Sequence, residues 1–406
     1  MGGRQLTAQM SPFTMTKVPE SICNFLVGQP SKALIPRGIL DQAFRDTINA
    51  NTDAYIYQYP TLVGPLHVRQ TLADYLTSSG RYPRIGPENI CLTFGNSHGI
   101  TLAIKHLTRP GDLVIVEDPT YFLVGQILRD AYVNVQMCPV HTENGLDLDL
   151  LENMVLQLKP ALVYINPIHH NPTGTCLSVA KRRRLIQLSI DHDFYIVSDE
   201  PYVLLGFQEF DEKCSSLGAS VSIADYSKLV CCGSFSKILT PGLRCGWISA
   251  HPSVIEKISF DGTLRSGGGP PSIIAQTISS LIESGLLKTH RAFLSQELAY
   301  RARRMMECID GSILGKHATY HRPQGGYFLY LSFQDERFDT ERFREFVNRK
   351  FPKVDFLPGA KCSVLPSTPS RGLRLSFSFY DADEIEYGIS LLATRFKQFF
   401  QMHLTS

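Results

Sequence analysis

The chain has 406 residues, of which 43% are apolar and 19% charged, and 40 basic residues nearly balance 38 acidic ones, leaving a net charge of +2. The length exceeds what one hydrophobic core usually supports, so we expect a globular protein with one large and one smaller domain. The balanced charge excludes the strongly basic surface that binds nucleic acid or anionic membranes, and we expect neither partner.

The first 24 residues predict a flexible tail. Arg4 and Lys17 are basic and no acidic residue precedes Glu20, a pattern that leaves an organelle transit peptide open. We otherwise expect a cytoplasmic location. No apolar run reaches the roughly 18 residues of a membrane span. The ten cysteines form no CxxC pair, and we expect reduced thiols.

Residues 25–50 predict an N-terminal arm of the smaller domain, and residues 51–285 predict the large domain. Its expected strands are Leu113–Val116, Ala161–Ile165, Phe194–Ser198 and Leu229–Cys232, with a helix at Ala180–Asp191. Continuous apolar strands separated by helices indicate an α/β fold, in which a mostly parallel sheet has helices on both faces. Ligands of such sheets bind beyond the C-terminal ends of the strands.

Residues 286–406 predict a smaller α+β domain. A long helix near Ser280–Met306 is expected to connect it with the large domain. Gly326–Leu331 and Leu373–Phe377 have the pattern of antiparallel strands, and Glu384–Phe400 that of a closing amphipathic helix.

Lys237 follows an apolar strand in the turn Gly233-Ser234-Phe235-Ser236-Lys237, where a solvated charge is poorly placed. Burial lowers the pKa of a lysine and frees its amine as a nucleophile toward aldehydes. The hydroxyls of Ser234 and Ser236 and the planar fork of Arg244 suit a phosphate. The segment therefore predicts a nucleophilic lysine beside a phosphate site.

The string SFSKxLxPGxRxGW, from Ser234 to Trp247, resembles the fold type I enzymes that use pyridoxal 5′-phosphate (PLP), specifically the class I/II aminotransferases. The resemblance runs from roughly residue 25 to residue 400, and it is closest to the branch of 2-aminoadipate and aromatic aminotransferases. It implies a PLP-transferase fold with a seven-stranded sheet in an α/β/α sandwich. It also implies that Lys237 holds PLP as a Schiff base (aldimine) during transfer of an amino group from an L-amino acid to a 2-oxo acid.

The resemblance assigns roles to further residues around the cofactor. Asp199 would keep the pyridine nitrogen protonated, which makes the ring an electron sink. Tyr202 and Asn171 would contact the phenolic oxygen, and Tyr121 would stack on the ring. Asn96 and Ser97, at a helix start, would join Ser234, Ser236 and Arg244 around the phosphate. Taken singly, Asp199 would also suit a helix N-cap, Asn171 an ordinary Asn-Pro turn, and Tyr121 an aromatic residue of the core.

Three further positions concern the substrate and a second subunit. Arg374 lies inside an apolar strand, where a charge is costly unless paired, and the substrate α-carboxylate is the expected partner. Gly28 and Asn171 are also expected near the substrate. Tyr59, preferred over Tyr57, would reach the phosphate of the other subunit, which implies a homodimer with a shared active site.

Two other functions remain open. The same cofactor residues serve PLP enzymes that eliminate or substitute at the β- or γ-carbon. Some transcription regulators carry an aminotransferase-like domain, which we do not favour because the resemblance begins near residue 25, without room for a DNA-binding domain.

We expect no metal site, since the adjacent His169 and His170 should diverge and no second ligand set follows. Arg265 and Arg322 are candidates for a second cation that binds an acidic substrate side chain.

Overall fold

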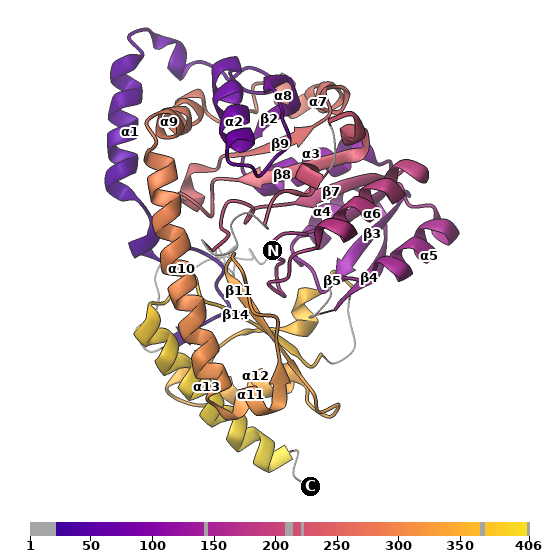
Figure 1. The fold of residues 1–406 in the computed structure, drawn as a ribbon, viewed down its shortest axis with the longest axis vertical. Helices are drawn as coiled ribbons and strands as arrows, with labels where there is room; N and C mark the ends of the chain where they lie inside the picture. Colours follow the sequence, from indigo (N-terminus) through magenta and orange to yellow (C-terminus); the bar gives the residue numbers. More distant parts are fainter. Residues whose placement is uncertain (1–21, 142–144, 208–213, 221–222, 366–369, 404–406) are drawn as a thin grey trace, which may run out of the picture.

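The computed structural model describes residues 22–141, 145–207, 214–220, 223–365 and 370–403 (Figure 1). These residues form an eight-stranded sheet, a four-stranded sheet and one two-stranded pair. Most of the tail predicted for residues 1–24 lies outside the described residues. Its last three residues form strand β1 (Ile22–Asn24), which pairs in parallel with β12 (Lys353–Asp355).

The large sheet consists of short apolar strands. In spatial order they are β2 (Ile90–Thr93), β9 (Gly246–Ala250), β8 (Leu229–Ser234), β7 (Tyr195–Asp199), β6 (Leu162–Ile165), β3 (Leu113–Asp118), β4 (Asn134–His141) and β5 (Gly145–Leu146). The run from β8 to β4 is parallel, whereas β9 is antiparallel to both of its neighbours. Seven strands match the expected number, and the two-residue β5 extends the edge as an eighth.

Helices cover both faces of this sheet. One face packs against α3 (Asn96–Leu107), α4 (Val124–Asp130), α7 (Pro252–Ser259) and α8 (Gly262–Arg265), and the other against α2 (Leu66–Ser78), α5 (Leu148–Leu158) and α6 (Val179–Asp191). The strands divide their side chains between the two cores: Val114 and Val116 belong to one, and Ile115 to the other. The predicted α/β/α sandwich is confirmed.

The smaller sheet is antiparallel. Its order is β10 (Ala318–Thr319), β11 (Phe328–Phe333), β14 (Gly372–Ser376) and β13 (Leu357–Pro358). The helices α11 (Ile313–His317), α12 (Thr340–Asn348) and α13 (Ala382–His403) accompany it (Figure 1). The predicted antiparallel strands correspond to β11 and β14, which pair directly, and the predicted closing helix corresponds to α13.

The long connecting helix predicted near Ser280–Met306 is present, but it begins later than predicted, and the first predicted residues belong to a separate helix. The chain forms α9 (Ser272–Glu283), which packs on α1 (Arg37–Ala50), and then α10 (Leu286–Asp310), which runs from the large sheet to the small one (Figure 1). Gly285 separates α9 and α10 with φ of +74°, a left-handed conformation that glycine adopts without a steric penalty. None of the described helices combines the length and apolar composition needed to cross a membrane.

The parallel strands end in polar residues at one edge of the large sheet. Asp118 closes β3, Asn166 follows β6, Asp199 closes β7 and Ser234 closes β8. Because neighbouring parallel strands place their C-terminal ends together, this edge is where a ligand site is expected.

Candidate active site

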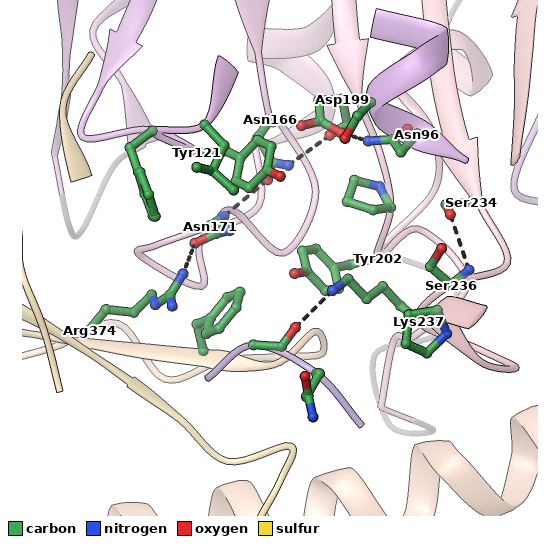
Figure 2. A pocket seen from close by; sticks show the side chains of 18 of the residues that line it. Asn96, Tyr121, Asn166, Asn171, Asp199, Tyr202, Ser234, Ser236, Lys237 and Arg374 are labelled. Carbon is green, nitrogen blue, oxygen red and sulfur yellow. Dashed lines mark hydrogen bonds between the residues drawn. The ribbon is translucent and has the colours of Figure 1, made fainter. Parts of the chain in front are cut away.

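A cavity of about 370 Å³ lies at this edge, between the two sheets (Figure 2). All but one of the residues proposed from the sequence line it: Gly28, Asn96, Ser97, Tyr121, Asn171, Asp199, Tyr202, Ser234, Ser236, Lys237, Arg244 and Arg374. The exception is Tyr59, whose side chain is exposed on the surface of the chain. The cavity therefore collects residues from the large sheet, the N-terminal segment and the small sheet.

Lys237 lies on the cavity wall, three residues after the end of β8. Its Nζ donates a hydrogen bond to the backbone oxygen of Gly28 at 2.8 Å, and the hydroxyl of Tyr327 donates to the backbone oxygen of Lys237 at 2.7 Å. Burial lowers the pKa of Lys237 to about 8, helped by the positive charges of Arg374 and Arg244. The neutral fraction near neutral pH is therefore much larger than for an ordinary lysine, and a neutral amine is a nucleophile and a base.

Asp199 is a fully buried carboxylate held by three side chains. Its Oδ2 accepts from the hydroxyl of Tyr164 at 2.5 Å, its Oδ1 accepts from Nδ2 of Asn96, and its backbone oxygen accepts from Nδ2 of Asn166 at 2.8 Å. Burial raises the pKa of Asp199 to about 6, opposed by the hydrogen bonds from Tyr164 and Asn96. A protonated ring nitrogen is a partner that favours the ionised form of this carboxyl group.

Two of these contacts were not predicted from the sequence. Tyr164 belongs to the apolar run of β6 and resembles a core residue, while Asn166 resembles a residue of the turn that follows. Asn96 was predicted to contact a phosphate, but its side-chain amide donates to Asp199 instead. The signals in the sequence are the polar Asn166 directly after a predicted strand and the hydroxyl of Tyr164 within that strand.

The start of helix α3 forms the anion end of the cavity. Ser97 belongs to its first turn, Ser236 Oγ accepts a 3.4 Å hydrogen bond from Nη1 of Arg244, and the backbone N–H of Ser236 donates to Ser234 Oγ at 3.1 Å. A Cβ atom at Gly95 would lie 2.8 Å from Nη2 of Arg244, so glycine allows this guanidinium to approach the helix start. Free N–H groups, hydroxyls and a guanidinium together suit a phosphate.

Arg374 projects from β14 into the opposite end of the cavity (Figure 2). Its Nη1 donates to Oδ1 of Asn171 at 2.7 Å and its Nη2 to the backbone oxygen of Leu26 at 2.6 Å, while its guanidinium lies over the ring of Phe328, 4.0 Å from the centroid. Its buried Nε has no hydrogen-bond partner among the described residues. A buried cation bonded only to neutral groups favours an incoming carboxylate.

The charges of the cavity fit PLP and an amino acid. Three cationic side chains, Lys237, Arg244 and Arg374, line it against the single carboxylate of Asp199. A phosphate at the helix start and a carboxylate at Arg374 balance this excess, and Asp199 suits a pyridinium.

Known proteins contain the same arrangement of domains. The sequence profile of the family "Aminotransferase class I and II" matches residues 22–392. The chain is 27% identical over 377 residues to aromatic-amino-acid aminotransferase 1 of Thermococcus litoralis (91% of this chain, 87% of the relative). It is 26% identical over 380 residues to a 2-aminoadipate transaminase of Thermus thermophilus (93% and 90%). The crystal structure of LysN, an alpha-aminoadipate aminotransferase from Thermus thermophilus complexed with N-(5′-phosphopyridoxyl)-L-leucine, superposes with a TM-score of 0.83 at 26% identity, covering 94% of each chain.

The fold and the cavity define a PLP-dependent enzyme of fold type I. Within this class, the chain belongs to the class I and II aminotransferases. It is a transferase that moves an amino group between amino acids and 2-oxo acids, and its relatives support this reaction over elimination or substitution.

Replacing Tyr164 with Phe tests the support of Asp199. We expect kcat to fall by about tenfold, since a hydrogen bond to a buried charged group is worth roughly 1.5–3 kcal/mol. Losing this donor raises the pKa of Asp199, so the acidic limb of the kcat–pH profile moves to higher pH. Steady-state kinetics across pH measure both effects.

Tyr82→Phe is the matched control, because the hydroxyl of Tyr82 donates to another buried carboxylate, Glu200, which does not line the cavity. This variant should lose stability and keep the wild-type pH profile. Equal pH profiles for Tyr164→Phe and the wild type would contradict the role given to Tyr164.

Proposed function

We propose that this aminotransferase acts on L-amino acids with uncharged, mainly aromatic or large aliphatic side chains. The supporting observation is the composition of the cavity wall, whose lining includes the apolar side chains of Leu26, Phe122, Leu123 and Phe328. A relative named for aromatic amino acids is consistent with this class, whereas the relative named for 2-aminoadipate acts on a substrate whose side chain ends in a carboxylate.

Neither candidate for a second substrate cation lines the cavity. Arg322 bonds to Asp310 at 2.5 Å, and the guanidinium of Arg265 lies over the ring of Phe260. Among the described residues of one chain, the cations of the cavity are therefore those assigned to the cofactor and to the α-carboxylate. Among these residues, the cavity offers no further cation that could bind an acidic side chain of the substrate.

We assign each residue a role from its position. PLP, when bound, supplies an aldehyde that captures amines and a protonated ring that withdraws electrons from the substrate α-carbon. Arg374 and Asn171 bind and orient the α-carboxylate, while Asp199 keeps the ring nitrogen protonated. The Nζ of Lys237 removes the proton from the α-carbon as a general base and returns it as an acid.

The remaining residues position the cofactor. Ser97, Ser234, Ser236 and Arg244 bind the phosphate through donors at the start of α3 and in the turn after β8. Tyr121 covers the ring, and burial raises the pKa of its hydroxyl to about 12, so it stays protonated. Tyr202 donates to the phenolic oxygen, and Gly28 leaves room for the substrate beside Phe328.

A half-reaction screen tests the proposed substrates. Purified enzyme carrying PLP is mixed with each amino acid in the absence of an acceptor, while the visible band of the cofactor and the released 2-oxo acid are followed. Phenylalanine, tyrosine and leucine should react at least about tenfold faster than aspartate, a difference of roughly 1.4 kcal/mol in barrier height. Aspartate reacting fastest would refute the substrate class, and sustained ammonia release without an acceptor would refute amino-group transfer.

We also propose a homodimer in which Tyr59 reaches the phosphate of the other subunit. Tyr55, Tyr57 and Tyr59 are 79%, 63% and 83% exposed, and the neighbouring Leu62 and Leu66 are exposed as well. Such a concentration of aromatic and aliphatic surface is typical of a protein–protein interface.

The free thiols of the chain support a reducing compartment such as the cytoplasm, which we propose as its location.

Mixing two inactive variants tests the shared site. Lys237→Ala and Tyr59→Ala protomers are unfolded and refolded together, so that half of the dimers carry one of each. In these dimers one site holds both changes and the other holds neither, which restores about one quarter of the wild-type activity in a twofold-symmetric dimer. No recovery, with dimers confirmed by sedimentation, would place Tyr59 outside the partner's site.

A further inference from the structure

Three side chains of the kind that bind soft metals, His169, Cys176 and Cys214, lie close together beside the turn that carries Asn171. Sγ of Cys176 lies 3.7 Å from Sγ of Cys214 and 3.4 Å from Nδ1 of His169, and the three ligand atoms all lie within 4.8 Å of one another. His169 and Cys214 are buried, and Cys176 is partly buried. The sequence did not suggest this group, because Cys214 is 38 residues away from Cys176.

The surrounding backbone holds the imidazole in place. His169 adopts a left-handed conformation with φ of +49°, which is uncommon for a residue with a side chain. A Cβ atom at Gly325 would lie 2.3 Å from Cε1 of His169, so only glycine accommodates the ring at that point. The backbone N–H of His169 donates to Sγ of Cys176 at 3.2 Å, which fixes the sulfur beside the ring.

We propose that Nδ1 of His169 and the Sγ atoms of Cys176 and Cys214 bind one divalent cation of the zinc class. Tetrahedral zinc has Zn–S distances of about 2.3 Å and Zn–N distances of about 2.0–2.1 Å, which separate neighbouring ligand atoms by roughly 3.5–3.8 Å. The observed separations of 3.7 and 3.4 Å are close to two edges of such a tetrahedron, and the third pair of ligand atoms lies within 4.8 Å. The fourth position is left to a water molecule.

The charges of the three ligands suit a buried divalent cation. Binding displaces one proton from each thiol, and the two thiolates then neutralise the two positive charges of the cation.

This site lies next to the catalytic machinery but is separate from it. His169 precedes Asn171 by two residues, and Asn171 accepts a hydrogen bond from Arg374. A bound cation would join the turn of residues 169–176 to the segment at Cys214. We therefore expect metal binding to raise the thermal unfolding temperature of the holoenzyme and to restrain the loop that carries Asn171.

Cobalt binding tests the proposal. The holoenzyme is treated with a chelator, loaded with Co²⁺ and desalted, and the metal content and the visible bands of thiolate-bound tetrahedral Co²⁺ are measured. The wild type should retain one ion per chain, while Cys176→Ser, Cys214→Ser and His169→Gln should each bind at least about tenfold more weakly, because each loses one ligand. Cys308→Ser, which removes a thiol elsewhere, should bind as the wild type does.

Three results would overturn the proposal, and the first two need no variant to fold. The first is a wild-type protein that retains no Co²⁺. The second is a wild-type protein in which a disulfide joins Cys176 and Cys214 and no metal is bound. The third is equal metal content in the wild type and in folded Cys176→Ser and Cys214→Ser proteins, which would reduce the group to hydrogen-bonded side chains.

Discussion

Lys237→Ala is expected to abolish both covalent attachment of the cofactor and turnover. Borohydride reduction of the wild-type holoenzyme should leave the cofactor on the peptide that contains Lys237, and no peptide of the variant should carry it. Because Nζ is also the proposed acid and base, kcat should fall by about 10²–10⁴-fold or more. Peptide mass analysis and single-turnover kinetics measure the two effects.

Two comparisons distinguish the loss of the catalytic amine in Lys237→Ala from a general loss of structure. Lys288→Ala, on the exposed side of α10, should keep wild-type activity and the labelled peptide. A small primary amine added to Lys237→Ala should restore part of the rate, because a free amine can remove the α-proton in place of Nζ. A labelled peptide in the Lys237→Ala variant would refute the assignment of this lysine.

Arg374→Ala should have its main effect on the substrate. Removing one partner of a buried charged pair costs roughly 2–5 kcal/mol, which corresponds to a loss of about 30- to 4,000-fold in kcat/KM. The loss should appear mainly in KM for the amino acid, while the affinity for PLP changes little. Arg374→Lys should recover only a part, because an ammonium group cannot form the bidentate pair.

Arg371→Ala is the matched control for this position. Arg371 lies just before the same strand, is half-exposed, and faces the exposed Glu336 at 3.9 Å. Its removal should change kcat/KM by less than about twofold, since exposed ion pairs contribute little. An Arg374→Ala enzyme with wild-type KM for its amino acid would show that another group binds the carboxylate.

The strand ends of the cavity could be predicted from the sequence because their chemistry is unusual for their position. Lys237 and Asp199 each follow an apolar run, where an unpaired charge is costly. Combined with the family resemblance, such positions indicated the cavity lining before any contact was known. The β-strand pattern also predicted the two faces of the sheet, since fully apolar strands need cover on both sides.

Contacts that depend on strand register could not be predicted. Tyr164 pairs with Val197 across β6 and β7, which brings its hydroxyl to the carboxylate of Asp199 two residues further on. A tyrosine in an apolar run has the same sequence pattern whether its hydroxyl meets a carboxylate or a core backbone group. The break between α9 and α10 was missed because the apolar periodicity continues on both sides of Gly285.

Substrate binding replaces hydrogen bonds that the N-terminal segment makes with the side chains of the site. The backbone oxygens of Leu26 and Gly28 accept hydrogen bonds from Arg374 and Lys237, the same two side chains that are proposed to handle the amino acid. The affinity for the amino acid therefore depends in part on these two backbone oxygens, which compete with it for Arg374 and Lys237. A change that shortens or displaces this segment should tighten ground-state binding and slow product release, because it removes acceptors that hold Arg374 and Lys237 before the amino acid binds.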